Sequence, residues 1–320
     1  MSLWRPTDPQ LFFSRQDPDD PRLGEIVKPI TSASAAVGPR AFVIGGYPDD
    51  EGIRLNGGRL GACEAPPVIR RTFYKMTPAL QETRDFTLYD YGDLSVSVPL
   101  AERHAAGSDA CSQVLNTGAR WIGLGGGHDY GFAEADGFLK ACSSTGVRPL
   151  VINFDAHFDV RPVSKGLSSG TPFFRMLSSG VDLDFAELGI QSQCNSATHL
   201  KWLQDRGARV LTMEDVEASG ESFETCAVRL LGDWILRPRP CFISVDIDAF
   251  SSAVAPGCSQ SWATGFMPHD FFPLFDLLLR RLDVRALGIY ETSPPLDIDD
   301  RTSKLAALIM HRYVSRGGRT

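Results

Sequence analysis

The sequence LVINFDAHFD, residues 150–159, passes directly from an apolar run into a cluster of acidic and histidine side chains. The run 150–154 is short and rich in β-branched and aromatic residues, which is typical of a buried strand. Asp155, His157 and Asp159 then follow at intervals of two residues. Because residues two apart in an extended chain project to the same side, these three side chains are expected to face one point.

Other short apolar runs resemble this one, and three of them also lead into acidic or histidine residues. The eight expected strands are 41–45, 86–91, 121–124, 150–154, 186–190, 209–213, 241–247 and 287–290. His128 follows the third run through three glycines, and Glu291 follows the eighth. Asp246 and Asp248 lie at the end of the seventh. The polar clusters are therefore expected at the carboxyl ends of four strands.

The stretches between these runs have helical spacing of apolar residues, as in 271–279. Alternation of strand and helix predicts an α/β protein with a mainly parallel sheet covered by helices on both faces. In such sheets ligands bind beyond the carboxyl ends of the strands, so the polar clusters are expected to meet in one crevice. No linker or repeat divides the sequence, which favours one domain over residues 1–320 with an irregular arm at 1–40.

The composition excludes several classes of protein. The 320 residues include 32 Lys and Arg against 39 Asp and Glu, a formal net charge of −7, with no long basic run to bind nucleic acid or an anionic membrane surface. No stretch of about 18 apolar residues predicts a membrane span, and the polar start does not resemble a signal peptide. Seven cysteines without a C-x-x-C pair suit a reducing compartment, so a cytoplasmic protein is expected. Any redox role of the cysteines, including Cys258, stays open.

Six side chains at the strand ends are candidate metal ligands: His128, Asp155, His157, Asp159, Asp246 and Asp248. Clustered carboxylates repel one another and raise each other's pKa unless cations neutralise them. Several oxygens and two imidazoles, with no thiolate, favour Mn²⁺ over Zn²⁺. Six ligands are enough for two ions that share bridging carboxylates.

Four motifs resemble those of the ureohydrolase superfamily, which includes arginases, agmatinases and formimidoylglutamases. They are GGGHD at 125–129, NFDAHFDV at 153–160, SVDIDAFSSAVAPG at 244–257 and the acidic stretch that ends at Glu291. The segment 46–70 resembles the superfamily's glycine-rich N-terminal motif, so the likeness covers roughly residues 40–315. It implies an arginase-like, three-layer α/β/α sandwich around a central eight-stranded, mainly parallel sheet.

The resemblance also implies a binuclear centre with two Mn²⁺ per subunit. One ion would be bound by His128, Asp155, Asp159 and Asp246, and the other by Asp155, His157, Asp246 and Asp248. Asp155 and Asp246 would therefore bridge the two ions.

One departure separates the members of the superfamily. Arginases and agmatinases place a proton-shuttling His before a Gly in the segment after the second motif, and Ser169 stands at that position here. The segments that instead resemble formimidoylglutamases are SSGTPF at 168–173, HFDVR at 157–161, AVAPG at 253–257 and DIDDRTSKLAA at 297–307.

An enzyme of this kind would hydrolyse a small-molecule amidine, N-formimidoyl-L-glutamate, to L-glutamate and formamide in histidine degradation. A hydroxide bridging the two Mn²⁺ ions would attack the formimidoyl carbon. Asp248 would pass the released proton to the leaving amine, and Glu291 would hold the cationic amidinium.

The carboxylates of such a substrate require cationic or N–H donors, and two arginines near the motifs are candidates. Arg161 follows the second motif, and Arg59 lies in the N-terminal glycine-rich segment. The weaker polar candidates are Ser169, Thr171, Asn195 and Ser196. His199 and His269 are interpreted as ordinary surface or capping residues.

Two other functions stay open. The chain is alternatively a hydrolase of another amidine or guanidine, such as arginine, agmatine or a guanidino acid, that releases urea. It is also alternatively a non-catalytic ureohydrolase-like binding protein, although all six candidate ligands and Glu291 are present. The oligomeric state stays open as well, with a homo-oligomer as one alternative.

Overall fold

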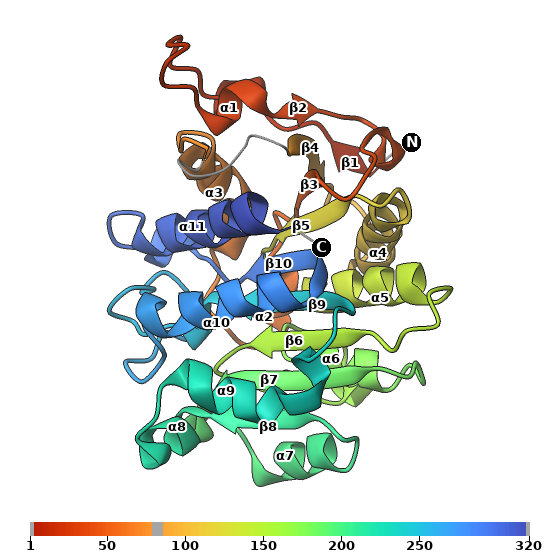
Figure 1. The fold of residues 1–320 in the computed structure, drawn as a ribbon, viewed down its shortest axis with the longest axis vertical. Helices are drawn as coiled ribbons and strands as arrows, with labels where there is room; N and C mark the ends of the chain where they lie inside the picture. The colour runs from red at the N-terminus through yellow and green to blue at the C-terminus, as the bar shows by residue number, and fades with distance from the viewer. Residues whose placement is uncertain (1–2, 79–85, 318–320) are drawn as a thin grey trace.

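The computed structural model describes residues 3–78 and 86–317. Across these residues one sheet of ten strands runs in the order β1-β4-β3-β5-β10-β9-β6-β7-β8, and β2 also pairs with β4 (Figure 1). The strands are β1 (Trp4–Arg5), β2 (Lys28–Pro29), β3 (Ala41–Gly46), β4 (Thr87–Leu94), β5 (Arg120–Leu124), β6 (Leu150–Phe154), β7 (Asp184–Ile190), β8 (Arg209–Thr212), β9 (Pro240–Asp246) and β10 (Asp283–Tyr290). The last strand in the sequence, β10, therefore lies in the middle of the sheet, between β5 and β9.

All eight expected strands form, within a few residues of their predicted bounds. Every pairing among these eight is parallel. The two further strands, β1 and β2, are two residues long and come from the arm 1–40. β1 pairs antiparallel with β4 and β2 pairs parallel with it, at one end of the sheet. The predicted eight-stranded parallel sheet is thus confirmed and is extended by two strands too short to leave an apolar pattern.

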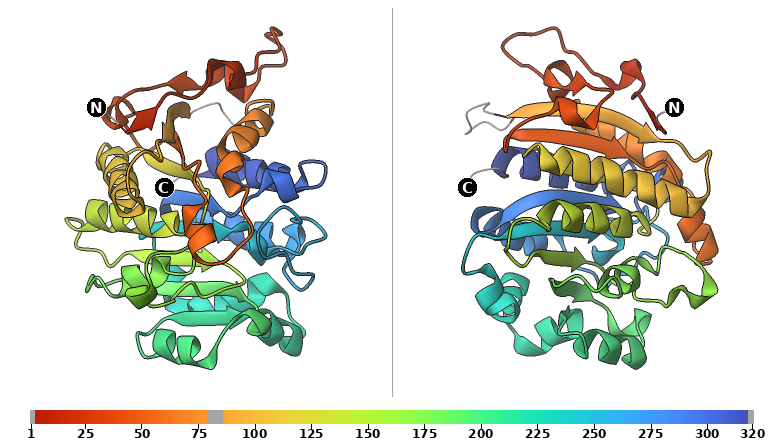
Figure 2. Two further views of the ribbon diagram at one scale, coloured as in Figure 1. Left: turned by 180° about the vertical axis from the view of Figure 1, so that it is seen from behind. Right: turned by 90° about the vertical axis from the view of Figure 1, so that its right-hand side faces the viewer.

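Helices cover both faces of the sheet and complete the predicted three layers (Figure 2). The α-helices are α1 (Leu23–Ile26), α2 (Glu51–Leu55), α3 (Ala65–Phe73), α4 (Leu100–Asn116), α5 (Tyr130–Cys142), α6 (Pro172–Leu177), α7 (Ala197–Gln204), α8 (Met213–Ser219), α9 (Phe223–Leu231), α10 (Pro268–Arg281) and α11 (Arg301–Arg316). Short 3-10 helices lie at Pro9–Leu11, Ala33–Ala35, Ala62–Glu64, Val163–Lys165, Ser192–Cys194, Gly232–Ile235, Ile247–Ala249 and Pro294–Leu296. Helices α3, α8, α9, α10 and α11 share one hydrophobic cluster, and α4, α5, α6 and α7 share the other.

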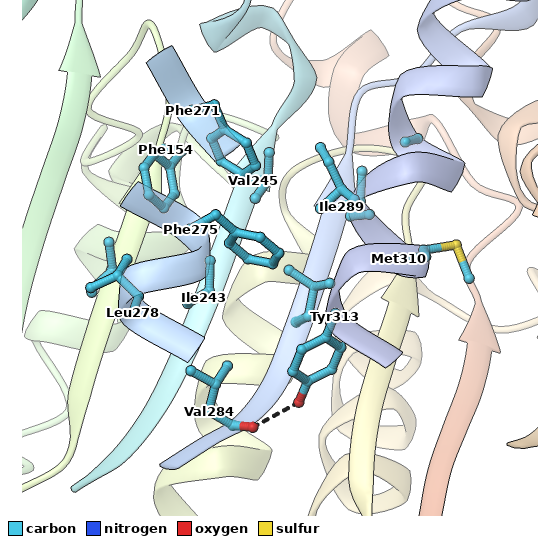
Figure 3. Packing of buried hydrophobic residues seen from close by; sticks show 14 of the residues in the cluster. Phe154, Ile243, Val245, Phe271, Phe275, Leu278, Val284, Ile289, Met310 and Tyr313 are labelled. Atoms are coloured by element: carbon cyan, nitrogen blue, oxygen red, sulfur yellow. Dashed lines mark hydrogen bonds between the residues drawn. The ribbon is translucent and has the colours of Figure 1, made fainter. Parts of the chain in front are cut away.

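Figure 3 shows the first cluster, where α10 and α11 pack against the central strands. Phe271 of α10 lies against Phe154 at the end of β6, with ring centroids 5.0 Å apart. Tyr313 of α11 buries its ring and donates its hydroxyl to the Val284 carbonyl of β10 at 2.8 Å. The buried face of α10 includes the apolar residues whose spacing predicted a helix at 271–279. Within the described ranges, no helix combines the length and the apolar character needed to cross a bilayer.

Candidate active site

Four neighbouring strands end in the side chains that the sequence singled out. β5, β10, β9 and β6 pair in parallel, so their carboxyl ends share one edge of the sheet. His128 follows β5, Glu291 follows β10, Asp246 ends β9, and Asp155 follows β6. A cavity of about 560 Å³ opens at this edge, and carboxylates form part of its lining. Segments distant in the sequence therefore meet in one crevice.

A first group of candidate metal ligands consists of His128, Asp155, Asp159 and Asp246. His128 Nδ1 lies 3.1 Å from Asp155 Oδ2, 2.9 Å from Asp159 Oδ2 and 3.2 Å from Asp246 Oδ2. This nitrogen is buried, and among the described residues it has no partner with hydrogen-bond geometry. One orphaned nitrogen aimed between three carboxylate oxygens fits a shared cation, which is the partner that satisfies all four atoms.

A second group consists of Asp155, His157 and Asp248, so Asp155 belongs to both groups. His157 Nδ1 lies 3.1 Å from Asp248 Oδ2 and 3.5 Å from Asp155 Oδ1. Asp246 does not join this second group, and its Oδ1 instead accepts a hydrogen bond from the Asp248 backbone N–H at 2.9 Å. The geometry therefore suits Asp155 to bridging, and the bridging role of Asp246 stays a prediction.

The imidazole of His128 is held from two sides. Its Nε2 lies 2.8 Å from Ser244 Oγ, which leaves Nδ1 to face the carboxylates. The ring of Tyr290 stacks on it with centroids 4.8 Å apart, and the edge of Phe173 contacts it from another side. A second contact of this kind commonly fixes the orientation of a metal-binding histidine.

A fully buried carboxylate, Glu134 of α5, lies behind Tyr290. It accepts hydrogen bonds from the Tyr290 hydroxyl and from Trp121 Nε1, the latter at 2.7 Å. A Cβ atom at Gly123 or Gly288 would overlap with this carboxylate, so two glycines that face each other in β5 and β10 make room for it. Burial raises the pKa of Glu134 to about 7.

These two glycines belong to a cross-strand row one layer beneath the candidate ligands. The row consists of Gly123, Gly288, Ser244, Asn153 and Glu187, in β5, β10, β9, β6 and β7. Asn153 Nδ2 donates to Asp155 Oδ2 at 3.2 Å and to Glu187 Oε2 at 2.8 Å. Through Ser244 and Asn153, the row positions one ligand of the first group and the ligand that both groups share.

The electrostatics of the two groups also call for added positive charge. Burial and the neighbouring Asp248 and Asp155 raise the pKa of Asp246 well above its usual value. Burial alone would lower the pKa of His128, but the adjacent carboxylates raise it strongly. Carboxylates that raise each other's pKa and hold a proton on an imidazole are the arrangement that a divalent cation stabilises.

Glu291 and Asp159 both have positive φ angles, of 64° and 48°. This conformation is uncommon for residues other than glycine and concentrates at functional sites. Glu291 Oε1 accepts a hydrogen bond from the His128 backbone N–H at 3.0 Å, and the Glu291 N–H donates to the Gly126 carbonyl at 2.8 Å. These bonds hold the Glu291 carboxylate in the cavity lining, beside the first group.

Four of the six residues expected to contact substrate line the cavity: Arg161, Ser169, Asn195 and Ser196. Ser169 Oγ accepts a hydrogen bond from Asn56 Nδ2 at 3.1 Å. Asn195 has a structural task, because its Oδ1 accepts from the Phe158 N–H and its Nδ2 donates to the Ala156 carbonyl. Asn195 therefore braces the loop that carries the second motif.

The other two, Arg59 and Thr171, are not in the lining. Arg59 donates from Nε to the Ser259 carbonyl and from Nη2 to the Cys258 carbonyl, which fastens two loops together. Thr171 is buried and bonds locally to Ser168. These bonds engage Arg59 Nε and Nη2 and the Thr171 hydroxyl, and a substrate contact by either residue stays a prediction.

The cavity also contains residues that the sequence did not single out. Asn56 and Gly58 come from the glycine-rich segment near α2, and His199 comes from the first turn of α7. His199 was expected to be an ordinary surface or capping residue, and nothing in its local sequence distinguishes it from one. Cys258 is buried, and burial raises its pKa, which disfavours a reactive thiolate.

Comparisons with known proteins agree with this geometry. The sequence profile of the arginase family matches residues 40–315. The formimidoylglutamase of Rhodococcus opacus is 32% identical over 298 residues, which cover 90% of this chain and 89% of that protein. The formimidoylglutamase of Aeromonas hydrophila is 30% identical over 323 residues, which cover 98% of this chain and all of that protein.

The fold matches solved structures over nearly the whole chain. The crystal structure of Trypanosoma cruzi formiminoglutamase with Mn²⁺ superposes with a TM-score of 0.80 at 28% identity, covering 94% of this chain and 99% of that one. The Bacillus subtilis formimidoylglutamase superposes with a TM-score of 0.81 over 96% of this chain and 95% of that one. At 23% identity, the second likeness bears on the fold alone.

Proposed function

This chain belongs to the arginase family, and we propose that it is a binuclear-manganese hydrolase that cleaves N-formimidoyl-L-glutamate to L-glutamate and formamide. The observation that carries the proposal is the convergence of His128 Nδ1 with three carboxylate oxygens at the cavity edge. The choice of substrate within the family is supported by relatives that are formimidoylglutamases along nearly the whole chain.

The two groups would hold two Mn²⁺ ions per subunit. His128, Asp155, Asp159 and Asp246 would hold one ion. Asp155, His157 and Asp248 would hold the other, with Asp246 as its predicted fourth ligand. When bound, such a pair of ions lowers the pKa of a shared water, so that a nucleophile is available at neutral pH.

The chain's own residues would then handle the proton and the positive charge of the substrate. Asp248 lines the cavity with a carboxylate and would carry the released proton to the leaving nitrogen of glutamate. Glu291, which the His128 N–H fixes in place, would pair with the cationic amidinium and orient its carbon.

The glutamate portion of the substrate brings negative charge into the same cavity. Arg161 presents a guanidinium there, and the planar donors of that group match a carboxylate. Asn56 and Ser169, which bond to each other in the lining, add polar donors beside it. We therefore assign the recognition of the glutamate portion to this wall.

We also propose that the protein acts on this small molecule in the cytoplasm and binds neither nucleic acid nor membranes. The net charge of −7 and the lack of a long basic run support the second part, and seven cysteines without a C-x-x-C pair support a reducing compartment. A homo-oligomer stays one alternative.

The test is an assay of glutamate and formamide release from N-formimidoyl-L-glutamate. Mn²⁺-loaded and chelator-treated protein are compared, with arginine and agmatine as parallel substrates. The expected result is metal-dependent turnover of N-formimidoyl-L-glutamate alone. Urea release at a comparable rate would favour a guanidine hydrolase, and failure to bind Mn²⁺ would favour a non-catalytic binding protein.

A further inference from the structure

Two basic side chains in the cavity lining have no acidic partner. These are Arg161 and His199. Among the described residues, neither the guanidinium of Arg161 nor either ring nitrogen of His199 takes part in a hydrogen bond or an ion pair. The acidic side chains of the same lining are Asp159, Asp246, Asp248 and Glu291, which belong to the candidate metal groups or adjoin them. Arg161 and His199 are therefore available to bind an acceptor group of a ligand in the cavity.

The position of Arg161 is set by its own loop. Its backbone N–H donates to the Gly170 carbonyl at 2.8 Å. A Cβ atom at Gly170 would lie only 2.7 Å from Arg161 Cδ and 3.0 Å from Nε, so the arginine passes closely over this glycine. The same Cβ would meet Asn56 Nδ2 at 3.2 Å, which places Arg161 beside the polar wall. Glycine at this position leaves room for the arginine side chain, which reaches the cavity lining.

The position of His199 is set by a different element. It lies in the first turn of α7, where its backbone N–H donates to the capping Ser196 Oγ at 3.2 Å. The residue before that cap, Asn195, bonds to the Phe158 N–H at 2.9 Å and to the Ala156 carbonyl at 2.7 Å. Because Ala156 and Phe158 alternate with the candidate ligands of the second motif, the start of α7 is fixed to the metal-binding loop.

The two basic groups also act on each other. Burial, followed by the charge of Arg161, lowers the pKa of His199. A positive charge on His199 beside the Arg161 guanidinium therefore costs free energy, and a carboxylate bound between the two groups lowers that cost. Arg161 offers N–H donors and positive charge to a carboxylate, and the imidazole of His199 offers an N–H donor in either protonation state.

We propose that Arg161 and His199 together bind a carboxylate of the glutamate portion of the substrate, which makes His199 a specificity-determining residue for acidic substrates. This inference rests on the proposed function, because that function supplies the carboxylates. Arg161 contributes from the loop after β6 and His199 from α7, so the subsite is made from two elements that Asn195 ties together. A substrate without the carboxylate would leave the two basic groups unpaired and would bind weakly.

The test is steady-state hydrolysis of N-formimidoyl-L-glutamate by the Mn²⁺-loaded His199→Phe variant, which keeps a flat ring and loses both ring nitrogens. We expect KM to rise about 10-fold and kcat to stay within about twofold, because the lost contact serves binding rather than bond cleavage. Inhibition by L-glutamate should weaken by the same factor. His199→Gln, which keeps one N–H donor, should show a smaller rise in KM.

The matched control is His269→Phe, since the side chain of His269 is 79% exposed and lies outside the cavity. Its KM should equal that of the wild type. A His199→Phe enzyme whose KM and glutamate inhibition both stay within about twofold of the wild type would overturn the subsite and leave the proposed function intact.

Failure of the proposed function would look different, because the wild-type protein itself would not turn over N-formimidoyl-L-glutamate. In that case calorimetric titration with glutarate tests the subsite alone. If glutarate binding is lost in His199→Phe and kept in His269→Phe, the result supports the carboxylate subsite. Equal glutarate binding by wild type and His199→Phe, or no binding by either, overturns the subsite.

Discussion

The two ends of the sheet carry similar acidic residues in opposite arrangements. At the amino end, Asp184 at the start of β7 pairs with Arg148 at 3.0 Å and with Arg239 at 2.6 Å. Asp283 at the start of β10 likewise pairs with Arg120 at 3.0 Å and with Arg285 at 2.6 Å. At the carboxyl end, the aspartates of the two candidate metal groups face one another and two imidazoles.

The aspartates at the amino end are neutralised by arginines of the protein, whereas those at the carboxyl end require a bound cation to neutralise them. An aspartate between two arginines is neutralised within the chain and serves the structure. Aspartates that raise each other's pKa keep the folded protein under electrostatic strain until a cation binds. We therefore expect substitutions of the metal-group aspartates to affect function and substitutions of the amino-end aspartates to affect stability.

The largest expected effect comes from Asp155→Asn, because Asp155 belongs to both metal groups. Activity should fall by about 1,000-fold or more, since a weakened binuclear centre no longer activates water. Metal analysis should show less Mn²⁺ per chain than in the wild type, and circular dichroism should show a retained fold. Full Mn²⁺ content together with full activity would contradict the assignment.

Glu291→Gln should have the next largest effect. The amide keeps the shape of the side chain but loses the charge that would pair with the amidinium, so kcat/KM should fall by about 100-fold. Mn²⁺ content should not change, because Glu291 is not in either metal group. If the variant loses metal in parallel with activity, Glu291 supports the centre rather than the substrate.

Glu134→Gln tests a buried carboxylate that lies behind the site and forms no ion pair with any residue that the structure describes. The folded pKa is raised to about 7 from 4.5, so its contribution to stability is fully present below about pH 4.5 and is lost as pH rises through about 7. As the pH rises from 5 to 8, the free energy of unfolding of the wild type should therefore fall by about 2–3 kcal/mol more than that of the variant. Urea unfolding of chelator-treated protein at several pH values measures this difference.

The matched control for that measurement is Glu217→Gln, at an exposed glutamate on α8. It should reproduce the pH dependence of the wild type. Parallel curves for Glu134→Gln and wild type would show that Glu134 stays ionised when buried.

The smallest effect is expected at the amino end. Asp184→Asn leaves Arg148 and Arg239 without their shared carboxylate, which should cost about 1–2 kcal/mol of unfolding free energy because Arg148 is half exposed. Mn²⁺ content and kcat should stay at wild-type values. Loss of metal in this variant would mean that the two ends are not independent.

The fold and the candidate ligands were the parts best predicted from the sequence. The central strands are mainly apolar, with single polar residues such as Asn153 and Ser244, because helices bury them on both faces, and such runs can be identified in a sequence. The candidate ligands come directly after these runs, so their common edge followed from the parallel sheet. The strands β1 and β2 escaped prediction, since two residues carry no periodicity.

The contacts to substrate were harder to predict, because they depend on side-chain direction rather than on strand position. Arg59 and Arg161 both lie next to motifs, yet one serves backbone carbonyls and the other faces the cavity. The sequence also did not predict that Glu134 of α5 lies behind Tyr290, the residue that stacks on His128. The only indication is the pair Gly123 and Gly288, which leaves space for this carboxylate.

The place of β10 in the sheet has a consequence for how the protein is made. A ribosome synthesises this strand last of the ten, yet it joins the half that contains β5 to the half that contains β9. Until it emerges, both halves expose an unpaired central edge, which is a template for aggregation. His128 belongs to one half and Asp155 to the other, so a nascent chain has no complete site to load with metal. Metal loading is therefore expected only after β10 has paired with both β5 and β9.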